Sequence, residues 1–98
     1  MNIEVNKNTN EIIIEVAGRL DTTTAPTLEK TINDNIDVTT NFVLDLKELK
    51  YISSAGLRVL LSTQKKMQQN GSMKVINVSE EVMEVFEMTG FADILCIE

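Results

Sequence analysis

The sequence contains no histidine, and Cys96 is the only cysteine among its 98 residues. Without histidine, the chain has no imidazole acid–base chemistry, no Ser-His-Asp or Cys-His catalytic set and no imidazole metal site. A lone cysteine cannot form an intrachain disulfide, which fits a reducing compartment. Neither a Gly-x-Gly-x-x-Gly nor a Walker-type motif is present, which argues against dinucleotide binding and NTP hydrolysis. We therefore expect no enzyme activity, no catalytic residue, no cofactor and no metal.

Basic residues are also scarce, because 9 Lys and Arg face 15 Asp and Glu and leave a net charge of −6. A negative surface repels phosphate backbones and anionic headgroups, so we expect no direct nucleic-acid or membrane partner. No apolar run approaches the ~20 residues of a membrane helix, and the first residues lack the basic and apolar regions of a signal peptide. The length suits one small domain over residues 1–98. We expect a cytoplasmic protein.

Short apolar segments alternate with polar turns along the whole chain. Alternating or β-branched stretches predict strands, and apolar spacings of three and four predict helices. The expected strands cover residues 2–6, 11–17, 42–46, 73–78 and 94–97. The expected helices cover 25–36, the stretch from the serines at 53–54 to Gly71, and the stretch from Ser79 to Gly90, with a polar loop over 35–41. The order ββαβαβαβ predicts an α/β fold with a mixed sheet of four to five strands and about three to four helices.

Two serines, Ser53 and Ser54, open the central helix shortly after a buried strand. The first amides of a helix lack intrahelical acceptors and lie at its positive end, which suits an anion such as a phosphate. Serine is equally normal as a plain helix cap. Gly56 costs helix stability, and either the close approach of a ligand or partner or tight helix packing explains it. Asp21 and Ser54 both follow strands, so we expect them at one sheet edge.

Four motifs in this order resemble the STAS domain of bacterial anti-sigma factor antagonists of the SpoIIAA and RsbV type. The resemblance covers essentially the whole chain. The motifs are Gly18-Arg19-Leu20-Asp21, then Asp45-Leu46 with Tyr51-Ile52 and Ser53-Ser54-Ala55-Gly56-Leu57, then Asn70-Gly71, and finally Phe86-x-Met88-Thr89-Gly90-Phe91.

The resemblance implies a partner switch. The unphosphorylated antagonist binds an anti-sigma factor with serine kinase activity and releases the sigma factor. Phosphorylation of one serine ends binding, and a metal-dependent serine phosphatase resets it. Aligned on Gly56, the phosphorylated serine is Ser54, with Ser53 where the family has Asp and Ala55 where it has a second Ser or Thr. The implied partner-binding residues are Asp21, Ser53, Ser54, Ala55, Gly56 and Arg58.

Two of these positions keep alternatives open. Arg58 stands at a position where the best-known members of the family often have a small residue. We expect its side chain to pair with an acidic partner surface or with the phosphate itself, or to be a solvated residue of the helix. Asp21 accepts a hydrogen bond from the serine hydroxyl or caps the next helix.

Two other functions also stay open. One is a STAS docking subunit of a larger complex, of the lipid-transport or stressosome type, without a phosphate cycle. The other is a small α/β enzyme or nucleotide-binding domain.

Overall fold

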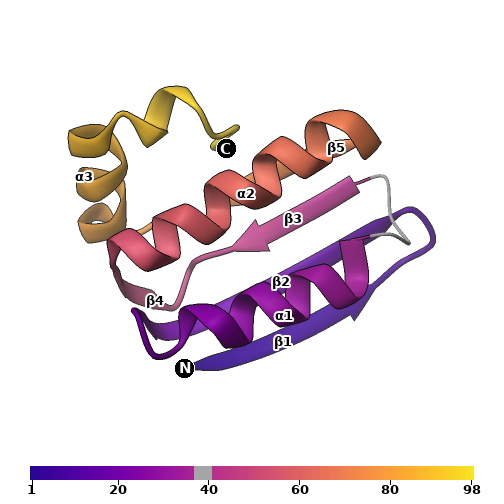
Figure 1. Cartoon of the computed structure of the whole chain (residues 1–98), viewed down its shortest axis with the longest axis horizontal. Helices are drawn as coiled ribbons and strands as arrows, with labels where there is room; N and C mark the ends of the chain where they lie inside the picture. The colour runs from indigo at the N-terminus through magenta and orange to yellow at the C-terminus, as the bar shows by residue number, and fades with distance from the viewer. Residues whose placement is uncertain (37–40) are drawn as a thin grey trace.

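The computed structural model describes residues 1–36 and 41–98, and this part of the chain forms five strands and three α-helices (Figure 1). A hairpin opens the chain, and the remaining strands alternate in part with the helices. The strands are β1 (Asn2–Lys7), β2 (Glu11–Leu20), β3 (Asn41–Asp45), β4 (Leu49–Ile52) and β5 (Ser72–Ile76). The helices are α1 (Ala25–Asn35), α2 (Ser54–Asn70) and α3 (Glu80–Thr89), followed by the 3-10 turn η2 (Phe91–Asp93).

The sheet is mixed, as the sequence predicts. Its strand order is β1-β2-β3-β5, with β1 antiparallel to β2 and the β2–β3 and β3–β5 pairs parallel. The long strand β2 has a second parallel partner, because its residues from Gly18 to Leu20 pair with β4, with a register shift between Gly18 and Arg19. Gly18 has a φ of +97°, a backbone conformation that suits glycine. One strand therefore joins the sheet centre to the small β4.

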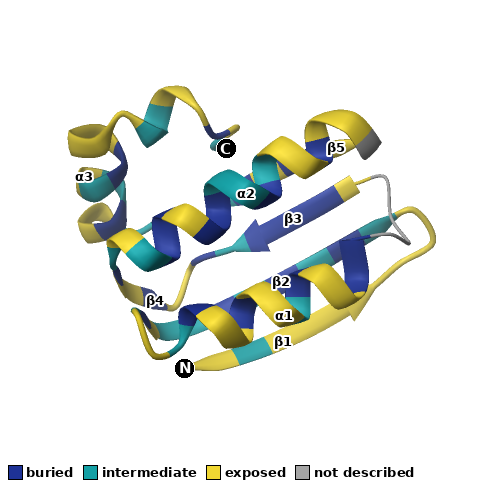
Figure 2. Cartoon of the chain, viewed as in Figure 1, coloured by how far each residue is buried: buried dark blue, intermediate teal, exposed yellow. Residues whose placement is uncertain are grey.

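Helices α1 and α2 lie side by side on one face of the sheet, and α3 packs against β4 at one end (Figure 1). Their buried sides face the strands, while their outer sides are exposed (Figure 2). The predicted apolar face of α1 is confirmed, since Ala25, Leu28, Ile32 and Ile36 are all buried. The core continues through β2 and β3, where the buried residues are Ile12, Ile14, Val16, Leu20, Phe42, Val43 and Leu44.

The helix ends carry the predicted signals. The Ser79 hydroxyl accepts a hydrogen bond from the Val82 amide (3.4 Å) and caps α3. Gly90 ends that helix in the left-handed conformation, with a φ of 83°. Pro26 lies in the first turn of α1, where its missing amide hydrogen costs no helical bond.

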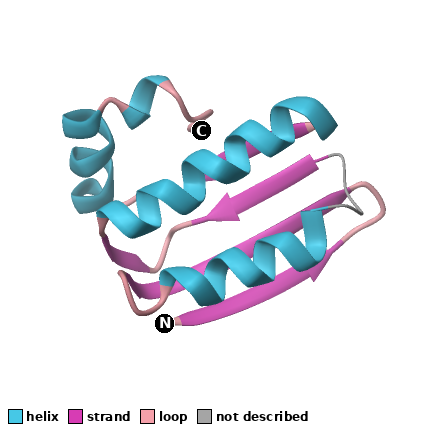
Figure 3. Cartoon of the chain, viewed as in Figure 1, coloured by secondary structure: helices cyan, strands magenta, loops and turns pink. Residues whose placement is uncertain are grey.

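Two details of the predicted order are wrong. Residues 49–52, expected as a connection, form β4. The last predicted strand, 94–97, is reduced to an isolated parallel bridge between Val75 and Ile97, and the chain before it forms η2 and loop (Figure 3). The predicted helix over 25–36 is confirmed as α1, which ends at Asn35, and residues 37–40 of the predicted loop lie outside the described residues.

A row of carboxylates crosses the sheet on the face opposite α1 and α2. The register places Glu4 of β1 opposite Glu15 of β2, and Glu15 opposite Asp45 of β3. The hydrogen bond between the Glu4 and Glu15 side chains raises the pKa of Glu15 above its usual value, and partial desolvation and the Glu4 and Asp45 charges add to this rise. Three carboxylates therefore lie side by side across these strands.

Candidate partner-binding site

The candidate site lies where β2 and β4 end. These strands run parallel, with Leu20 opposite Ile52, and the Ser53 amide donates to the Leu20 carbonyl (2.9 Å). Asp21 follows β2 directly, and the two serines follow β4. The structure therefore brings Asp21 and the serine segment to the same sheet edge, as the sequence predicts.

Ser53 is the N-cap residue of α2. Its backbone is extended (φ −98°, ψ 176°), and its hydroxyl oxygen accepts a hydrogen bond from the Gly56 amide (3.4 Å). Its carbonyl accepts from the Leu57 amide (2.9 Å), and the residue is half-buried. Ser53 is thus tied both to the end of β2 and to the first turn of α2.

Ser54 is the first residue of α2, and it is exposed. Within the described residues, its hydroxyl forms no hydrogen bond. The amides of this first turn are among those without an intrahelical acceptor. The sequence left the capping role open between the two serines. The structure assigns it to Ser53 and leaves the Ser54 hydroxyl facing solvent.

The two serines are expected to respond differently to truncation. Ser53→Ala removes the cap and should lower the free energy of unfolding by about 1 kcal/mol, within the range of about 0.5–2 kcal/mol for such caps. Ser54→Ala removes an exposed hydroxyl that bonds to no described residue, and it should change the free energy of unfolding by less than about 0.5 kcal/mol. Urea unfolding of both variants measures the difference. Equal losses would contradict the assignment of the cap to Ser53.

Asp21 holds the turn that leads into α1. Its Oδ1 accepts hydrogen bonds from the Thr23 hydroxyl (2.8 Å) and amide (3.0 Å), and from the Thr24 amide and hydroxyl (both 3.2 Å). The Thr23 hydroxyl bond, followed by the two amide bonds, keeps the pKa of Asp21 below its usual value. Of the two predicted roles, the structure shows the one at the start of α1, because Asp21 bonds to this turn and not to Ser54.

Gly56 is buried against the ends of β2 and β4. A Cβ atom there would lie 2.7 Å from Cγ of Leu20 and 2.9 Å from Cγ1 of Ile52. Real Cβ atoms essentially never come within 3.0 Å of such neighbours. Tight helix packing therefore explains this glycine. Its role in partner binding stays a prediction.

Arg58 is exposed one helical turn after Ser54. It lines a groove between α2 and the start of α1. The other residues of the groove are Thr22, Ala25, Pro26, Glu29, Ala55, Val59 and Ser62. Half-buried Ala55 connects the groove to Ser54. The groove therefore begins directly beside the candidate site.

Sequence reasoning missed a pair of residues beside this site. The Arg19 guanidinium lies 4.2 Å from the centre of the Tyr51 ring, a cation–π contact between β2 and β4. Tyr51 is 40% exposed, and it precedes Ile52 and Ser53 in the chain. The sequence indicates this contact only by an aromatic residue, Tyr51, in a polar segment. The contact with Arg19 could not be predicted without knowing that β4 forms and how it pairs with β2.

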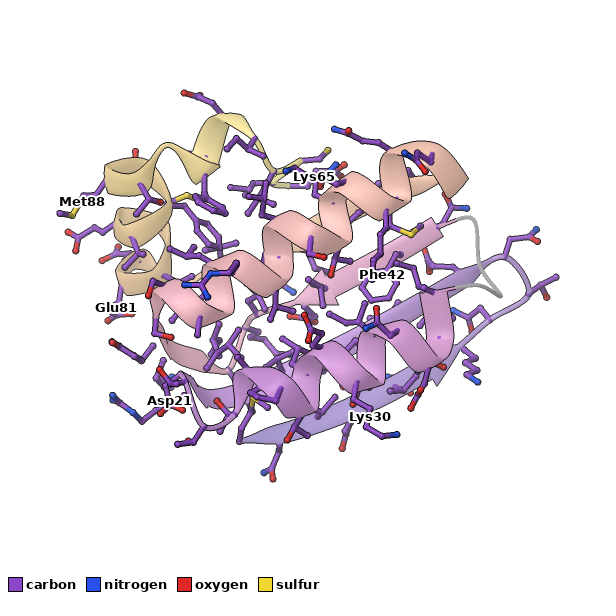
Figure 4. The ribbon with its side chains drawn as sticks, in the orientation of Figure 1. Asp21, Lys30, Phe42, Lys65, Glu81 and Met88 are labelled. Atoms are coloured by element: carbon purple, nitrogen blue, oxygen red, sulfur yellow. The ribbon has the colours of Figure 1, made fainter. Side chains whose placement is uncertain are left out.

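Carboxylates also lie around this end of the molecule. Glu80 and Glu81 form the first turn of α3, which packs against β4. Figure 4 shows Asp21 and Glu81 at the end of the molecule where α2 begins. The site is therefore an exposed serine on a surface that holds both acidic groups and the cation Arg58.

In the described part of the chain, no group of three or more Cys, Asp and Glu residues could hold a metal ion. None of its helices combines the length and the apolar character needed to cross a membrane.

Comparison with known proteins defines the family. The STAS domain model matches residues 2–98. The chain is 34% identical over 98 residues to an anti-sigma-B factor antagonist of Bacillus subtilis (strain 168), covering 99% of this chain and 90% of the relative. It is 30% identical over 97 residues to an anti-sigma-B factor antagonist of Staphylococcus aureus (strain NCTC 8325 / PS 47), covering 97% and 90%. The chain belongs to the STAS domain family.

Solved structures show the same fold. An anti-sigma factor antagonist from Mycobacterium paratuberculosis matches with a TM-score of 0.89 at 24% identity, covering 98% of this chain and 83% of that one. The unphosphorylated form of the anti-sigma factor antagonist SpoIIAA matches with a TM-score of 0.84 at 18% identity, covering 99% and 88%. The α/β fold with its mixed sheet is thus that of known antagonist structures.

Proposed function

We propose that this chain is a cytoplasmic anti-sigma factor antagonist that works by partner switching. Its unphosphorylated form binds an anti-sigma factor with serine kinase activity and so releases the sigma factor. Phosphorylation of Ser54 ends this binding, and a metal-dependent serine phosphatase restores it. The observation that carries the proposal is the exposed Ser54 hydroxyl at the start of α2, which bonds to no described residue and lies beside a serine that is already used as the cap. The chain is a substrate and binding partner in this cycle and not an enzyme.

Phosphorylation at Ser54 would act on the surface. A phosphoserine adds a charge of about −1.5 to −2 and three acceptor oxygens. Because Ser54 is exposed and bonded to no described residue, the added group requires no rearrangement of the core. It changes the charge and bulk that a partner meets, and it must lose its hydration to be buried in an interface. The fold is retained while partner binding is lost.

The proposed binding surface combines direct and supporting residues. Ser54 and Arg58 are exposed and are the direct contacts, with half-buried Asp21 and Ala55 at their sides. Ser53 and Gly56 support this surface, Ser53 as the cap and Gly56 by letting α2 pack closely on β2.

Binding and phosphorylation can be tested with one set of variants. The assays use four proteins, namely wild type, Ser54→Ala, Ser54→Glu and the neighbouring control Ser53→Ala. Each is titrated into a purified serine-kinase-type anti-sigma factor from the same genome to measure binding. Each is then incubated with this anti-sigma factor and labelled ATP to measure phosphorylation. We expect wild type and Ser54→Ala to bind equally and Ser54→Glu to bind at least about tenfold more weakly, a loss of about 1.4 kcal/mol. Phosphate should enter wild type and Ser53→Ala but not Ser54→Ala.

Two outcomes would contradict the proposal. One is equal binding of wild type and Ser54→Glu to the anti-sigma factor. The other is phosphate incorporation into Ser54→Ala at the wild-type level. Equal binding of all variants to one partner without kinase activity would instead identify a docking subunit without a phosphate cycle.

A further inference from the structure

We propose that Arg58 pairs with the phosphate on Ser54, so that one modification changes two residues of the binding surface. This inference rests on the proposed phosphorylation of Ser54. It adds a defined receptor for the phosphate within the chain and a reason for the arginine at this position.

Ser54 and Arg58 lie close together on α2. Ser54 and Arg58 are four residues apart in one helix, and both are exposed. Side chains at this spacing lie on the same helix face, with Cβ atoms about 5–6 Å apart. A phosphoserine at the first position and the long arginine side chain one turn later can therefore meet without any change in the backbone.

Arg58 is also available for this contact. Within the described residues it forms no ion pair and no hydrogen bond. Glu29 of α1 lines the same groove but forms no ion pair with it. By contrast, Arg19, the other arginine, is already stacked on Tyr51. Arg58 is thus a cation with no partner among the described residues, and it lies one turn away from the modified hydroxyl.

The chemistry of the two groups is matched. The planar guanidinium presents a fork of N–H donors that binds a phosphate through two parallel hydrogen bonds. Before phosphorylation, Arg58 offers its charge to an acidic group of the partner. After phosphorylation, the same charge is taken up within the chain. The partner then loses a hydroxyl contact at Ser54 and a cation at Arg58 in a single step.

The test measures the second pKa of the phosphate, which is near 6 in a phosphoserine. Phosphoserine is introduced at position 54 during translation. This is done in the otherwise wild-type protein and in the variants Arg58→Gln, Arg58→Lys and Lys65→Gln. The phosphate of each protein is then titrated by phosphorus NMR. Pairing with Arg58 favours the dianion, so Arg58→Gln should raise this pKa by about 0.3 units. Arg58→Lys should recover part of the shift, and Lys65→Gln, which removes another exposed cation of α2, should leave the pKa unchanged.

The carboxylates at this end, including Asp21 and Glu81, are the same in every variant, so they do not contribute to the differences. A second readout is the side-chain NεH resonance of Arg58, which should shift through the same midpoint. Equal phosphate pKa values in wild type and Arg58→Gln would overturn the inference. Because the phosphate is installed without a kinase, this result is independent of the binding assay that tests the proposed function.

Discussion

Replacing Leu20 with alanine is expected to lower the free energy of unfolding by about 2–5 kcal/mol. Leu20 is the last residue of β2 and is fully buried. Its side chain lies close to Gly56 in the first turn of α2. The truncation removes apolar burial and leaves a cavity between β2, β4 and α2, and both effects destabilise the fold.

Urea unfolding followed by circular dichroism measures this loss. Met88→Ala is the control, because Met88 is a large apolar residue that is 86% exposed, and its truncation should change stability by less than about 0.5 kcal/mol. Similar effects of the two substitutions would contradict the placement of Leu20 in the core.

Gly56→Ala is expected to destabilise the protein by up to about 2 kcal/mol. In an open helix position this change would stabilise by roughly 1 kcal/mol, because alanine has the higher helix propensity. Here the new methyl group would lie 2.7–2.9 Å from side-chain atoms of Leu20 and Ile52, and such overpacking costs about 1–3 kcal/mol. Denaturant unfolding therefore decides between the two effects by the sign of the change alone.

A double-mutant cycle sharpens this test. In the variant with both Leu20→Ala and Gly56→Ala, the new methyl group occupies part of the cavity that the leucine leaves. The combined loss should be smaller than the sum of the two single losses by at least about 1 kcal/mol. Gln68→Ala, an exposed position on α2, replaces Gly56→Ala in a control cycle that should be additive. Additivity in the first cycle would contradict the close packing at Gly56.

Most of the fold could be predicted because its elements have strong periodicity. The alternation in β2 and the apolar spacing of α1 follow from burial on one side, which sequence displays directly. The strand β4 could not be predicted, because its four residues include only one β-branched residue and their pairing with the far end of β2 is set by the fold. The last predicted strand, 94–97, is only a single bridge, between Val75 and Ile97. Its apolar residues alone do not show over how many residues the segment pairs with β5.

The candidate site shows the same division. The serine segment at the start of α2 and the place of Asp21 at the same edge follow from strand and helix order. The choice between Ser53 and Ser54 as the cap does not, because it depends on which residue has extended backbone angles. The contact between Arg19 and Tyr51 needs a cross-strand register that no local pattern specifies.

The hydrogen bond between the Ser53 amide and the Leu20 carbonyl joins the serine segment to the end of β2. It makes the surface a discontinuous epitope, assembled from chain segments that are far apart in the sequence. A linear peptide around the two serines would keep both hydroxyls and lose the anchor of the cap, the Asp21 turn and the groove wall from α1. Short peptides therefore make poor mimics, and inhibitors or antibodies against this surface should be selected on the folded domain.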